Sequence, residues 1–394
     1  MLNTSKRVKE ITPSATLSID TMIKEMVANG EDIINLSVGE PDTNTPIKAS
    51  YKAIEGIVNN FTKYTNTSGI IELRKHLVRK FKIDNNLDYD IDQIIVSTGG
   101  KHSLYNAFMV ICDPGDEVIL PAPYWVSYPE QIKLTGAVPV VIKTDESTGF
   151  KITPSMLESV ITNKTKALVL NSPSNPTGAV YSESELRALA DLIIRHEFYI
   201  ISDEIYEKLT YTIDHLSIAN INEEIKDRTI IVNGFSKTYG MTGWRLGYTA
   251  GPKNIIKAMV DFQSHVTSNV TSIAQLAAIG ALEDYYTNQK SLFQERLECV
   301  YGHVRKMKYI NCLKPEGAFY LFPNTSECIG KSIDGEIITS SEHLCNLILT
   351  YAKVGIVSGS GFGAPDNVRI SYAMDIKQLD EAMNRINRFL EALK

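Results

Sequence analysis

The sequence has few of the features that mark a membrane protein, a disulfide-bonded scaffold or a metal centre. Its five cysteines are scattered and odd in number, and their spacing matches no metal-binding pattern, which fits reduced thiols in the cytoplasm. No apolar run approaches the ~18 residues of a transmembrane helix, and no apolar segment follows Lys6, Arg7 and Lys9. The net charge of −6 argues against nucleic-acid partners, which require a basic face. We therefore expect a cytoplasmic protein with no membrane partner.

The composition is that of an ordinary globular protein, with 394 residues of which 43% are hydrophobic and 22% charged. Strand-like runs alternate with helical patterns from about residue 50 to residue 290, which predicts an α/β fold with a mostly parallel sheet covered by helices. These runs are 117–120, 138–142, 167–170, 199–202 and 230–233. A helix is expected over 183–196, because Ser182 and Glu185 form a capping pattern.

The C-terminal part has a different pattern. A charged helical segment runs through residue 305, a strand-like run covers 317–322, and an amphipathic helix begins at Ile376. We predict a smaller α+β domain here, joined by the N-terminal segment. The glycine-rich stretch 359–363 has no βαβ unit around it, so it is expected to be a loop and not a dinucleotide-binding motif.

The most informative stretch is 236–248, which follows the buried strand-like run 229–233. Its Lys237 lies just past a strand end, with Ser236 beside it and Arg245 eight residues further on. A lysine amine can form a Schiff base with the aldehyde of pyridoxal phosphate, and serine and arginine can hold a phosphate dianion. A lysine in such a loop is also commonly a solvent-exposed surface charge. Only the other segments can distinguish a cofactor-binding lysine from a surface one.

Two further strand ends carry polar groups. Asn175 lies in a loop between two prolines after the run 168–170; Pro176 restricts its backbone, although such a loop can also be a plain turn. Asp203 ends the next strand, where open α/β sheets bind ligands. There it could pair with a protonated pyridine nitrogen, and Tyr206 could contact the ring's 3-oxygen. The alternative is a helix-capping aspartate followed by a core tyrosine.

A third segment, 94–106, combines a strand, Gly99-Gly100 and a helical pattern. Backbone N–H groups at the start of a helix can cradle a phosphate. Two adjacent glycines are weak evidence alone, but they complement the lysine, serine and arginine of the 236–248 segment.

In this order, the four segments resemble the fold type I pyridoxal phosphate enzymes of the class I/II aminotransferase family. The likeness extends from Leu36-Ser37-Val38-Gly39-Glu40-Pro41-Asp42 to Asn367-Val368-Arg369-Ile370-Ser371-Tyr372-Ala373. Within the family the chain is similar to the bacterial aspartate aminotransferase branch, through Pro13-Ser14-Ala15-Thr16, Tyr124-Trp125-Val126-Ser127-Tyr128-Pro129 and Met241-Thr242-Gly243-Trp244-Arg245. The resemblance implies a seven-stranded sheet, a large domain over 45–292, and a small domain formed by 1–44 and 293–394.

The resemblance also implies roles for individual residues. Lys237 would be the Schiff-base lysine and the base that moves the substrate's Cα proton. Asp203 would keep the pyridine nitrogen protonated, Asn175 and Tyr206 would contact the 3-oxygen, and Trp125 would stack on the ring. The phosphate would be held by the backbone of Gly100 and Lys101 and by Ser236 and Arg245. Tyr64 matches a tyrosine that reaches a phosphate in the neighbouring subunit, which implies a homodimer with shared active sites.

The substrate would be held from both of its ends. Arg369 and the backbone of Gly39 match the groups that bind the α-carboxylate, and Asn175 and Trp125 also border the substrate. For the distal carboxylate of aspartate or glutamate, Lys101 and Thr16 match the contacting positions, with Ser14 nearby. Lys101 could instead be a first-turn helix residue with its amine in solvent. Branch members that accept prephenate often carry a basic residue where this chain has Thr12.

The expected reaction is transamination of L-aspartate with 2-oxoglutarate, giving oxaloacetate and L-glutamate through a ping-pong cycle. Alternatives are an aspartate/prephenate aminotransferase, a transaminase of broader aromatic specificity, or a β-lyase on the same scaffold, which an apolar distal pocket would favour. A regulator that uses the fold as a sensor is a further alternative. Such a regulator carries an added DNA-binding module, for which we see no N-terminal extension.

Overall fold

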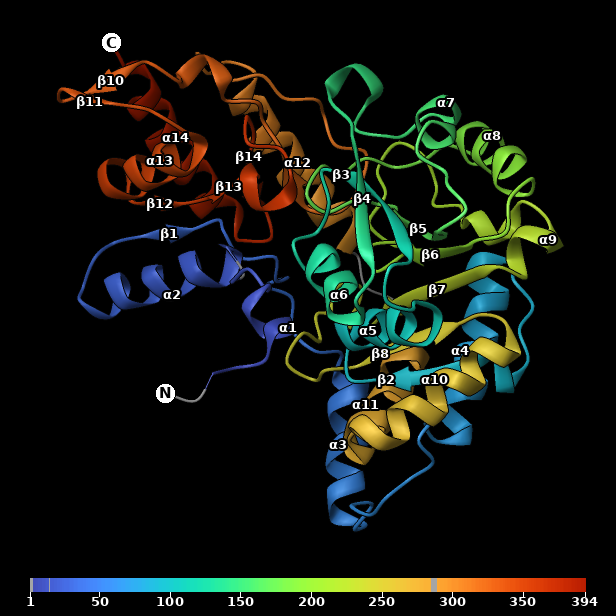
Figure 1. The fold of residues 1–394 in the computed structure, drawn as a ribbon. Coiled ribbons are helices and arrows are strands. Elements are labelled where there is room, and N and C mark those ends of the chain that lie inside the picture. The colour runs from blue at the N-terminus through green and yellow to red at the C-terminus, as the bar shows by residue number, and fades with distance from the viewer. Residues whose placement is uncertain (1–2, 14, 285–288) are drawn as a thin grey trace.

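The computed structural model describes residues 3–13, 15–284 and 289–394, and for residues 15–18 it describes the backbone alone. The chain forms two neighbouring parts, a large sheet covered by helices and a smaller group of short strands and helices (Figure 1). Among the described residues, none of the helices combines the length and the apolar character needed to cross a membrane.

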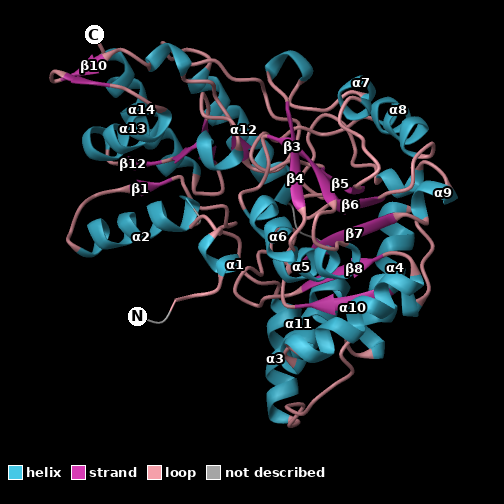
Figure 2. Ribbon diagram, viewed as in Figure 1, coloured by secondary structure: helices cyan, strands magenta, loops and turns pink. Residues whose placement is uncertain are grey.

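A central sheet organises the larger part (Figure 2). Its seven strands follow the order β2-β8-β7-β6-β5-β3-β4. They are β2 (Ile94–Ser97), β3 (Glu117–Ala122), β4 (Val138–Lys143), β5 (Thr165–Asn171), β6 (Tyr199–Asp203), β7 (Thr229–Gly234) and β8 (Gly247–Ala250). Strand β8 runs in the direction opposite to the other six. The predicted α/β fold with a mostly parallel seven-stranded sheet is therefore confirmed.

This topology collects chemistry at one edge of the sheet. Strands β2, β5, β6 and β7 all end there, and β8 begins there because it is reversed. In register, Asp203 of β6 lies beside Asn171 of β5, and Gly247 of β8 lies between Gly234 of β7 and Ser97 of β2. Loops that follow these strands are thereby brought side by side, although they lie far apart in the sequence.

Both faces of the sheet are covered by helices, so its strands are apolar throughout. On β5, Ala167 and Val169 pack with α5, α6 and α10, whereas Leu168 and Leu170 pack on the opposite face with α7 and α8. Helices α3, α4 and α11 cover the β2–β8–β7 end. The bounds are α3 (Ile47–Val58), α4 (Ile71–Asn85), α5 (Gly100–Ile111), α6 (Ser127–Thr135), α7 (Pro154–Glu158), α8 (Glu183–Ile193), α9 (Glu223–Lys226), α10 (Lys253–Val266) and α11 (Ser272–Glu283).

The smaller part combines both ends of the chain. Strand β1 pairs in parallel with β12, and β14 lies between β13 and β9. Its elements are α2 (Ala15–Ala28), β1 (Ile34–Asn35), α12 (Gln289–Val304), β9 (Tyr320–Leu321), β10 (Ser332–Ile333), β11 (Glu336–Ile337), α13 (Ser341–Leu347), β12 (Val354–Gly355), β13 (Val357–Ser358), β14 (Val368–Ser371) and α14 (Ile376–Glu391). Helix α1 (Lys6–Lys9) lies beside α6 of the larger part (Figure 1). One apolar core joins Ile34 and Leu36 to α12, α13 and α14.

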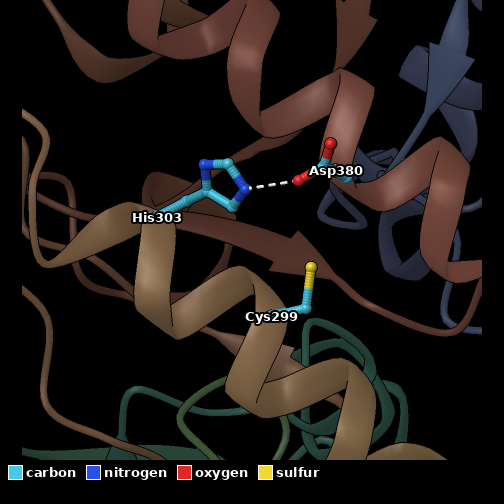
Figure 3. Close-up of side chains that lie close together, drawn as sticks. All are labelled: Cys299, His303 and Asp380. Atoms are coloured by element: carbon cyan, nitrogen blue, oxygen red, sulfur yellow. Dashed lines mark hydrogen bonds and ion pairs between the residues drawn. The ribbon is translucent and has the colours of Figure 1, made fainter.

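A polar contact joins α12 to α14 at the surface of this part (Figure 3). His303 Nε2 lies 2.8 Å from Asp380 Oδ1, and Cys299 lies one helical turn before His303. Burial, Asp380 and Glu295 raise the pKa of the Cys299 thiol, so the thiol is protonated at neutral pH and is a poor metal ligand. We interpret this group as an interhelix contact.

Local predictions differ from the structure in three places. The expected helix over 183–196 opens with the predicted Ser182–Glu185 capping box but ends at Ile193. Of the strand-like run 317–322, only Tyr320–Leu321 forms a strand, because Ala318 takes a left-handed backbone with φ 56° that interrupts an extended chain. The stretch 359–363, expected to be a loop, contains a short 3₁₀ turn over Gly359–Phe362.

Candidate active site

A cavity of about 280 Å³ opens at the edge of the sheet where the four motifs meet. Eleven of the fourteen predicted site residues line it: Gly39, Gly100, Lys101, Trp125, Asn175, Asp203, Tyr206, Ser236, Lys237, Arg245 and Arg369. These residues come from the N-terminal segment, the central sheet and β14. The structure therefore brings together side chains that are as much as 330 positions apart in the chain.

Lys237 lies in the loop between β7 and β8 and points into the cavity. Its Nζ donates a hydrogen bond to the carbonyl oxygen of Gly39 at 2.6 Å. Burial, assisted by the positive charges of Arg369 and Arg245, lowers the pKa of the amine to about 8. A substantial fraction of the amine is therefore neutral and nucleophilic near physiological pH.

Asp203 is held at the end of β6 by two hydrogen bonds. Its Oδ2 accepts one from the Tyr128 hydroxyl at 2.7 Å, and its Oδ1 accepts one from the Ile205 backbone N–H at 3.2 Å. Burial raises the pKa of this carboxyl to about 6, although both hydrogen bonds act in the opposite direction. Asp203 is thus a buried carboxylate with a fixed direction and an elevated affinity for a proton or a cation.

Arg369 is a buried guanidinium on β14, only 3% exposed. It donates from Nη1 to Asn175 Oδ1 at 3.1 Å and from Nη2 to the Ser37 carbonyl at 2.6 Å. The ring of Tyr320 lies 4.6 Å from its Cζ. Within the described part of the chain, no carboxylate forms an ion pair with it, and its Nε has no hydrogen-bond partner. A buried cation without a counter-ion indicates a binding site for an anion.

A second group of positive charges lies at the start of α5. Gly99 caps this helix with φ 83°, and a Cβ at Gly99 would collide with the guanidinium of Arg245. Lys101 lies in the first turn, with its Nζ 4.9 Å from the centre of the Trp125 ring. Burial and the nearby charge of Arg245 lower the pKa of Lys101. Two adjacent cations at a helix N-terminus, beside Ser236, form a suitable site for a phosphate.

The Tyr320 hydroxyl lies next to both Tyr206 and Gly39. The hydroxyls of Tyr206 and Tyr320 lie 2.8 Å apart, and both side chains are buried. A Cβ at Gly39 would strike the Tyr320 hydroxyl, so this approach requires glycine. The hydroxyl pair thus lies between the loop that carries Gly39 and the cavity wall formed by β6.

Of the other three predicted residues, Tyr64 does not line the cavity of this chain, and the side chains of Ser14 and Thr16 are not described. Tyr64 is 92% exposed in the loop between α3 and α4. Ser14 lies outside the described residues, and only the backbone of Thr16, in α2, is described. Conversely, several residues that line the cavity are not predicted from the sequence. The main ones are Asp20, Ser37, Tyr128, Asn171 and Tyr320.

Comparison with known proteins places this architecture in a family. The family model for aminotransferase class I and II matches residues 31–386. An aspartate aminotransferase of Geobacillus stearothermophilus is 50% identical over 392 residues, which covers 98% of this chain and 99% of the relative. An aspartate/prephenate aminotransferase of Cereibacter sphaeroides is 44% identical, with 99% of both chains covered.

Solved structures agree with these sequence matches. The aspartate aminotransferase of Rhizobium meliloti superposes with a TM-score of 0.96 at 39% identity and full coverage of both chains. The Thermus thermophilus aspartate aminotransferase with maleate gives a TM-score of 0.92 at 38% identity, covering 99% of this chain and 100% of that one. With the match to the family model and the cavity at the sheet edge, these likenesses show that the chain belongs to the aminotransferase class I and II family.

Proposed function

We propose that this protein is a pyridoxal phosphate-dependent aminotransferase that converts L-aspartate and 2-oxoglutarate into oxaloacetate and L-glutamate. The observation that carries the proposal is the arrangement in the cavity. Lys237, whose amine has a lowered pKa, lines the same cavity as two other buried groups. These are the carboxylate of Asp203 and the guanidinium of Arg369, which has no counter-ion among the described residues. The relatives named aspartate aminotransferase, at up to 50% identity over nearly the full chain, support the substrate.

The residues present fit pyridoxal phosphate. The paired cations at the start of α5 suit its phosphate, with Ser236, Arg245 and the backbone of Gly100 and Lys101 as donors. Asp203 suits the protonated ring nitrogen, Trp125 the ring face, and Asn175 and Tyr206 the 3-oxygen. When bound, the cofactor supplies an aldehyde that reacts with amines and a ring that withdraws electrons from the substrate's Cα. Lys237 is the group that would bond to that aldehyde.

The chain's own residues then select one bond for reaction. Arg369 would bind the substrate's α-carboxylate through its planar fork of donors, with the Gly39 backbone beside it. Holding this carboxylate and the phosphate at opposite ends of the cavity orients the Cα–H bond and protects the carboxylate from loss. The Lys237 amine would remove the Cα proton as a general base, since its lowered pKa leaves part of it unprotonated near pH 7–8.

The proposal is tested by mixing the cofactor-loaded protein separately with aspartate, glutamate, phenylalanine and alanine, and recording the absorbance of the bound cofactor within one turnover. We expect aspartate and glutamate to convert the cofactor to its amine form much faster than phenylalanine or alanine do. Faster reaction of phenylalanine or alanine would contradict the assignment to acidic substrates. The same experiment in reverse, from the amine form with prephenate, tests the activity that some relatives' names include and that Thr12 leaves open.

Lys101 is our candidate for the cation that binds the distal carboxylate, together with Thr16 and Ser14. We expect Lys101→Ala to lower kcat/KM for aspartate and glutamate by about 10- to 100-fold, since a hydrogen bond to a charged group is worth ~1.5–3 kcal/mol. Alanine, which lacks the distal carboxylate, should lose far less. Lys257→Ala is the matched control, because that lysine lies exposed on α10. An equal loss for aspartate and alanine would assign Lys101 to the cofactor alone.

We also propose that the protein is a homodimer with shared active sites. Along α3, the apolar residues Ile47, Tyr51, Ile54 and Val58 follow one helical face and are 55–71% exposed. Tyr64, in the loop that follows α3, is 92% exposed. Helix α3 lies at the end of the molecule far from the smaller part (Figure 1). A continuous apolar face of this kind is typical of a subunit interface.

A lysine in the middle of this face should break the dimer. We expect Ile54→Lys to yield a monomer in analytical ultracentrifugation and to lose transaminase activity, because the partner's tyrosine would no longer reach the phosphate. Ile83→Lys is the matched control, since Ile83 is 67% exposed on α4, outside the α3 face. If Ile54→Lys remained dimeric, or if the wild-type protein sedimented as a monomer, the α3 face would not be the interface.

We further propose the division into a large domain over 45–292 and a small domain over 1–44 and 293–394. The shared apolar core of Ile34, Leu36 and the helices α12 to α14 supports this division. A cytoplasmic location is consistent with the five free cysteines, which would stay reduced there.

A further inference from the structure

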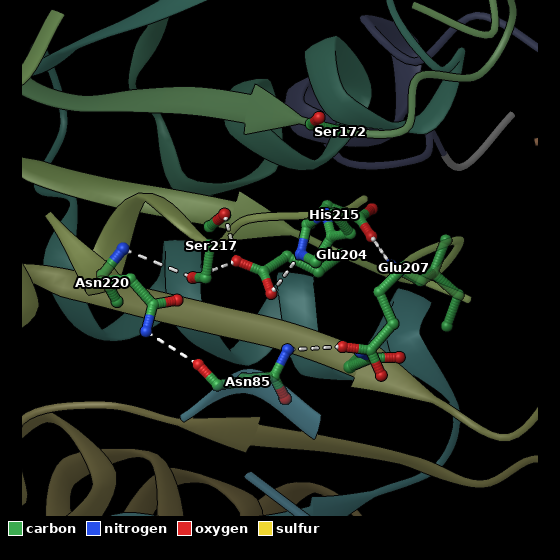
Figure 4. A network of polar contacts seen from close by, with 12 residues as sticks. Asn85, Ser172, Glu204, Glu207, His215, Ser217 and Asn220 are labelled. Atoms are coloured by element: carbon green, nitrogen blue, oxygen red, sulfur yellow. Dashed lines mark hydrogen bonds and ion pairs between the residues drawn. The ribbon is translucent and has the colours of Figure 1, made fainter. Parts of the chain in front are cut away.

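The residue after Asp203 in the chain, Glu204, belongs to a network of buried polar side chains that does not border the cavity (Figure 4). Glu204 is at its centre, only 1% exposed. Its Oε1 accepts hydrogen bonds from Ser202 Oγ at 2.9 Å and from Ser217 Oγ at 2.5 Å, and its Oε2 lies 3.0 Å from His215 Nε2. Every oxygen of this buried carboxylate is therefore bound to the loop or the strand next to Asp203.

The strand geometry links this network to Asp203. Because side chains alternate along a strand, Ser202 and Glu204 point away from the cavity while Asp203, between them, points into it. The hydrogen bond between Ser202 and Glu204 joins the two flanking side chains. The backbone N–H of Glu204 also bonds to the Val232 carbonyl of β7 at 2.9 Å. Asp203 is thus fixed on both sides at the point where its strand ends.

A second buried carboxylate, Glu207, lies close by but has its own cation. It forms an ion pair with Lys80 and accepts a hydrogen bond from Asn85 Nδ2 at 2.8 Å. One carboxylate oxygen of Glu204, one of Glu207 and a ring nitrogen of His215, all of which could ligate a metal ion, lie within 4.8 Å of one another. Since the ammonium of Lys80 and the hydrogen bonds already engage these oxygens, we interpret the group as an ion-pair network. Among the described residues, by contrast, the partners of the Glu204 carboxylate are the two hydroxyls and His215.

Burying a carboxylate with few cations is expensive, and buried ion pairs are poor evidence for a stabilising role. Burial is the main cause that raises the pKa of Asp203, and the negative charge of Glu204 raises it further. The same negative charge also favours the protonated, cationic form of a ring nitrogen bound beside Asp203. This effect on Asp203 would explain why a charged side chain is buried at position 204.

We propose that Glu204, held by Ser202, Ser217 and His215, is a positioning residue for Asp203. Its carboxylate holds the strand end that carries Asp203, while Tyr128 and the Ile205 N–H direct the Asp203 carboxylate itself. Glu204 also adds negative charge behind the cofactor ring, although it touches neither cofactor nor substrate. This inference rests on the proposed function, since it assigns Asp203 to the ring nitrogen of pyridoxal phosphate. It extends the site by a layer of residues behind the cavity wall.

The test compares Glu204→Gln with Glu207→Gln, which removes the other carboxylate of the same network. For Glu204→Gln we expect kcat of the aspartate half-reaction to fall about tenfold or more, the range seen when outer hydrogen-bond partners are lost at metal sites. KM for aspartate should stay within about twofold, because Arg369 and Lys101 are unchanged. Pyridoxal phosphate should bind several-fold more weakly to the cofactor-free variant, as measured by equilibrium dialysis.

For Glu207→Gln we expect a lower melting temperature, because Lys80 loses its counter-ion, with kcat and cofactor affinity close to those of the wild type. If Glu204→Gln is poorly folded, Ser217→Ala removes one hydrogen bond to the same oxygen and should give a smaller effect in the same direction. The proposal is wrong if the Glu204 variants change only the melting temperature. A wild-type protein that does not transaminate aspartate would refute the proposed function instead, and the dialysis would still test Glu204.

Discussion

Replacing Lys237 with alanine is expected to slow amino-group transfer about 10⁴-fold, at the upper end of what a general base contributes. The variant loses two functions together, the covalent bond to the cofactor and the base for the Cα proton. The partly neutral amine, with its pKa lowered to about 8, suits both functions. Single-turnover absorbance with aspartate measures the rate. After borohydride reduction and denaturation, the cofactor should remain attached to the wild-type chain and be released from the variant.

Lys101→Ala serves as the comparison, because Lys101 lines the same cavity but lies in the first turn of α5. That variant should keep the covalent cofactor. Small primary amines added to Lys237→Ala should restore part of the rate, since they can enter the cavity and accept the proton. Retention of covalently bound cofactor by Lys237→Ala would show that another lysine forms the bond.

Asp203→Asn is expected to lower kcat by about 10²- to 10³-fold, which corresponds to the ~3–4 kcal/mol typical of a preorganised electrostatic contact. Asparagine keeps the shape and can still accept the hydrogen bond from Tyr128, but it carries no negative charge for a ring nitrogen. The loss should appear in the rate of proton removal and less in KM for aspartate, because Arg369 is intact. Stopped-flow absorbance with Cα-deuterated aspartate measures that step.

Tyr128→Phe gives a graded comparison. It removes one hydrogen bond from Asp203 and leaves the charge. A hydrogen bond to a charged group is worth ~1.5–3 kcal/mol, which limits the loss to about 10- to 100-fold. The order wild type, Tyr128→Phe, Asp203→Asn should therefore hold for kcat. If Asp203→Asn were as active as the wild type, Asp203 would not be the partner of the ring nitrogen.

The sequence predicted best what is local. Each of Asn175, Asp203 and Lys237 follows a short apolar run, and the position of such residues at strand ends is readable from a window of about ten residues. Because the carboxyl ends of parallel strands share one edge, correct strand assignments already imply that these side chains meet. The family resemblance added Arg369 and Gly39, whose neighbourhoods are too ordinary to be recognised from the pattern alone.

What the pattern did not predict depends on long-range contacts. Tyr128 meets Asp203 across 75 positions, and Tyr320 meets Tyr206 across 114. Nothing in the local sequence distinguishes these tyrosines from core aromatics. The prediction of a strand over 317–322 was mostly wrong because Ala318 takes a left-handed backbone. Alanine seldom adopts this conformation, and the neighbouring residues give no sign of it. The role of Tyr64 lies beyond a single chain, since it requires a partner.

The hydrogen bonds of Arg369 have a thermodynamic consequence. Its partners Ser37 and Asn175 belong to the N-terminal segment and to the loop after β5, while Arg369 itself belongs to β14. An anion bound there touches segments that are remote in sequence and favours only the state in which all three are assembled. A dicarboxylate at 100 times its Kd would thereby add about 2.7 kcal/mol to the free energy of unfolding. The melting temperature should therefore rise with the concentration of the bound dicarboxylate.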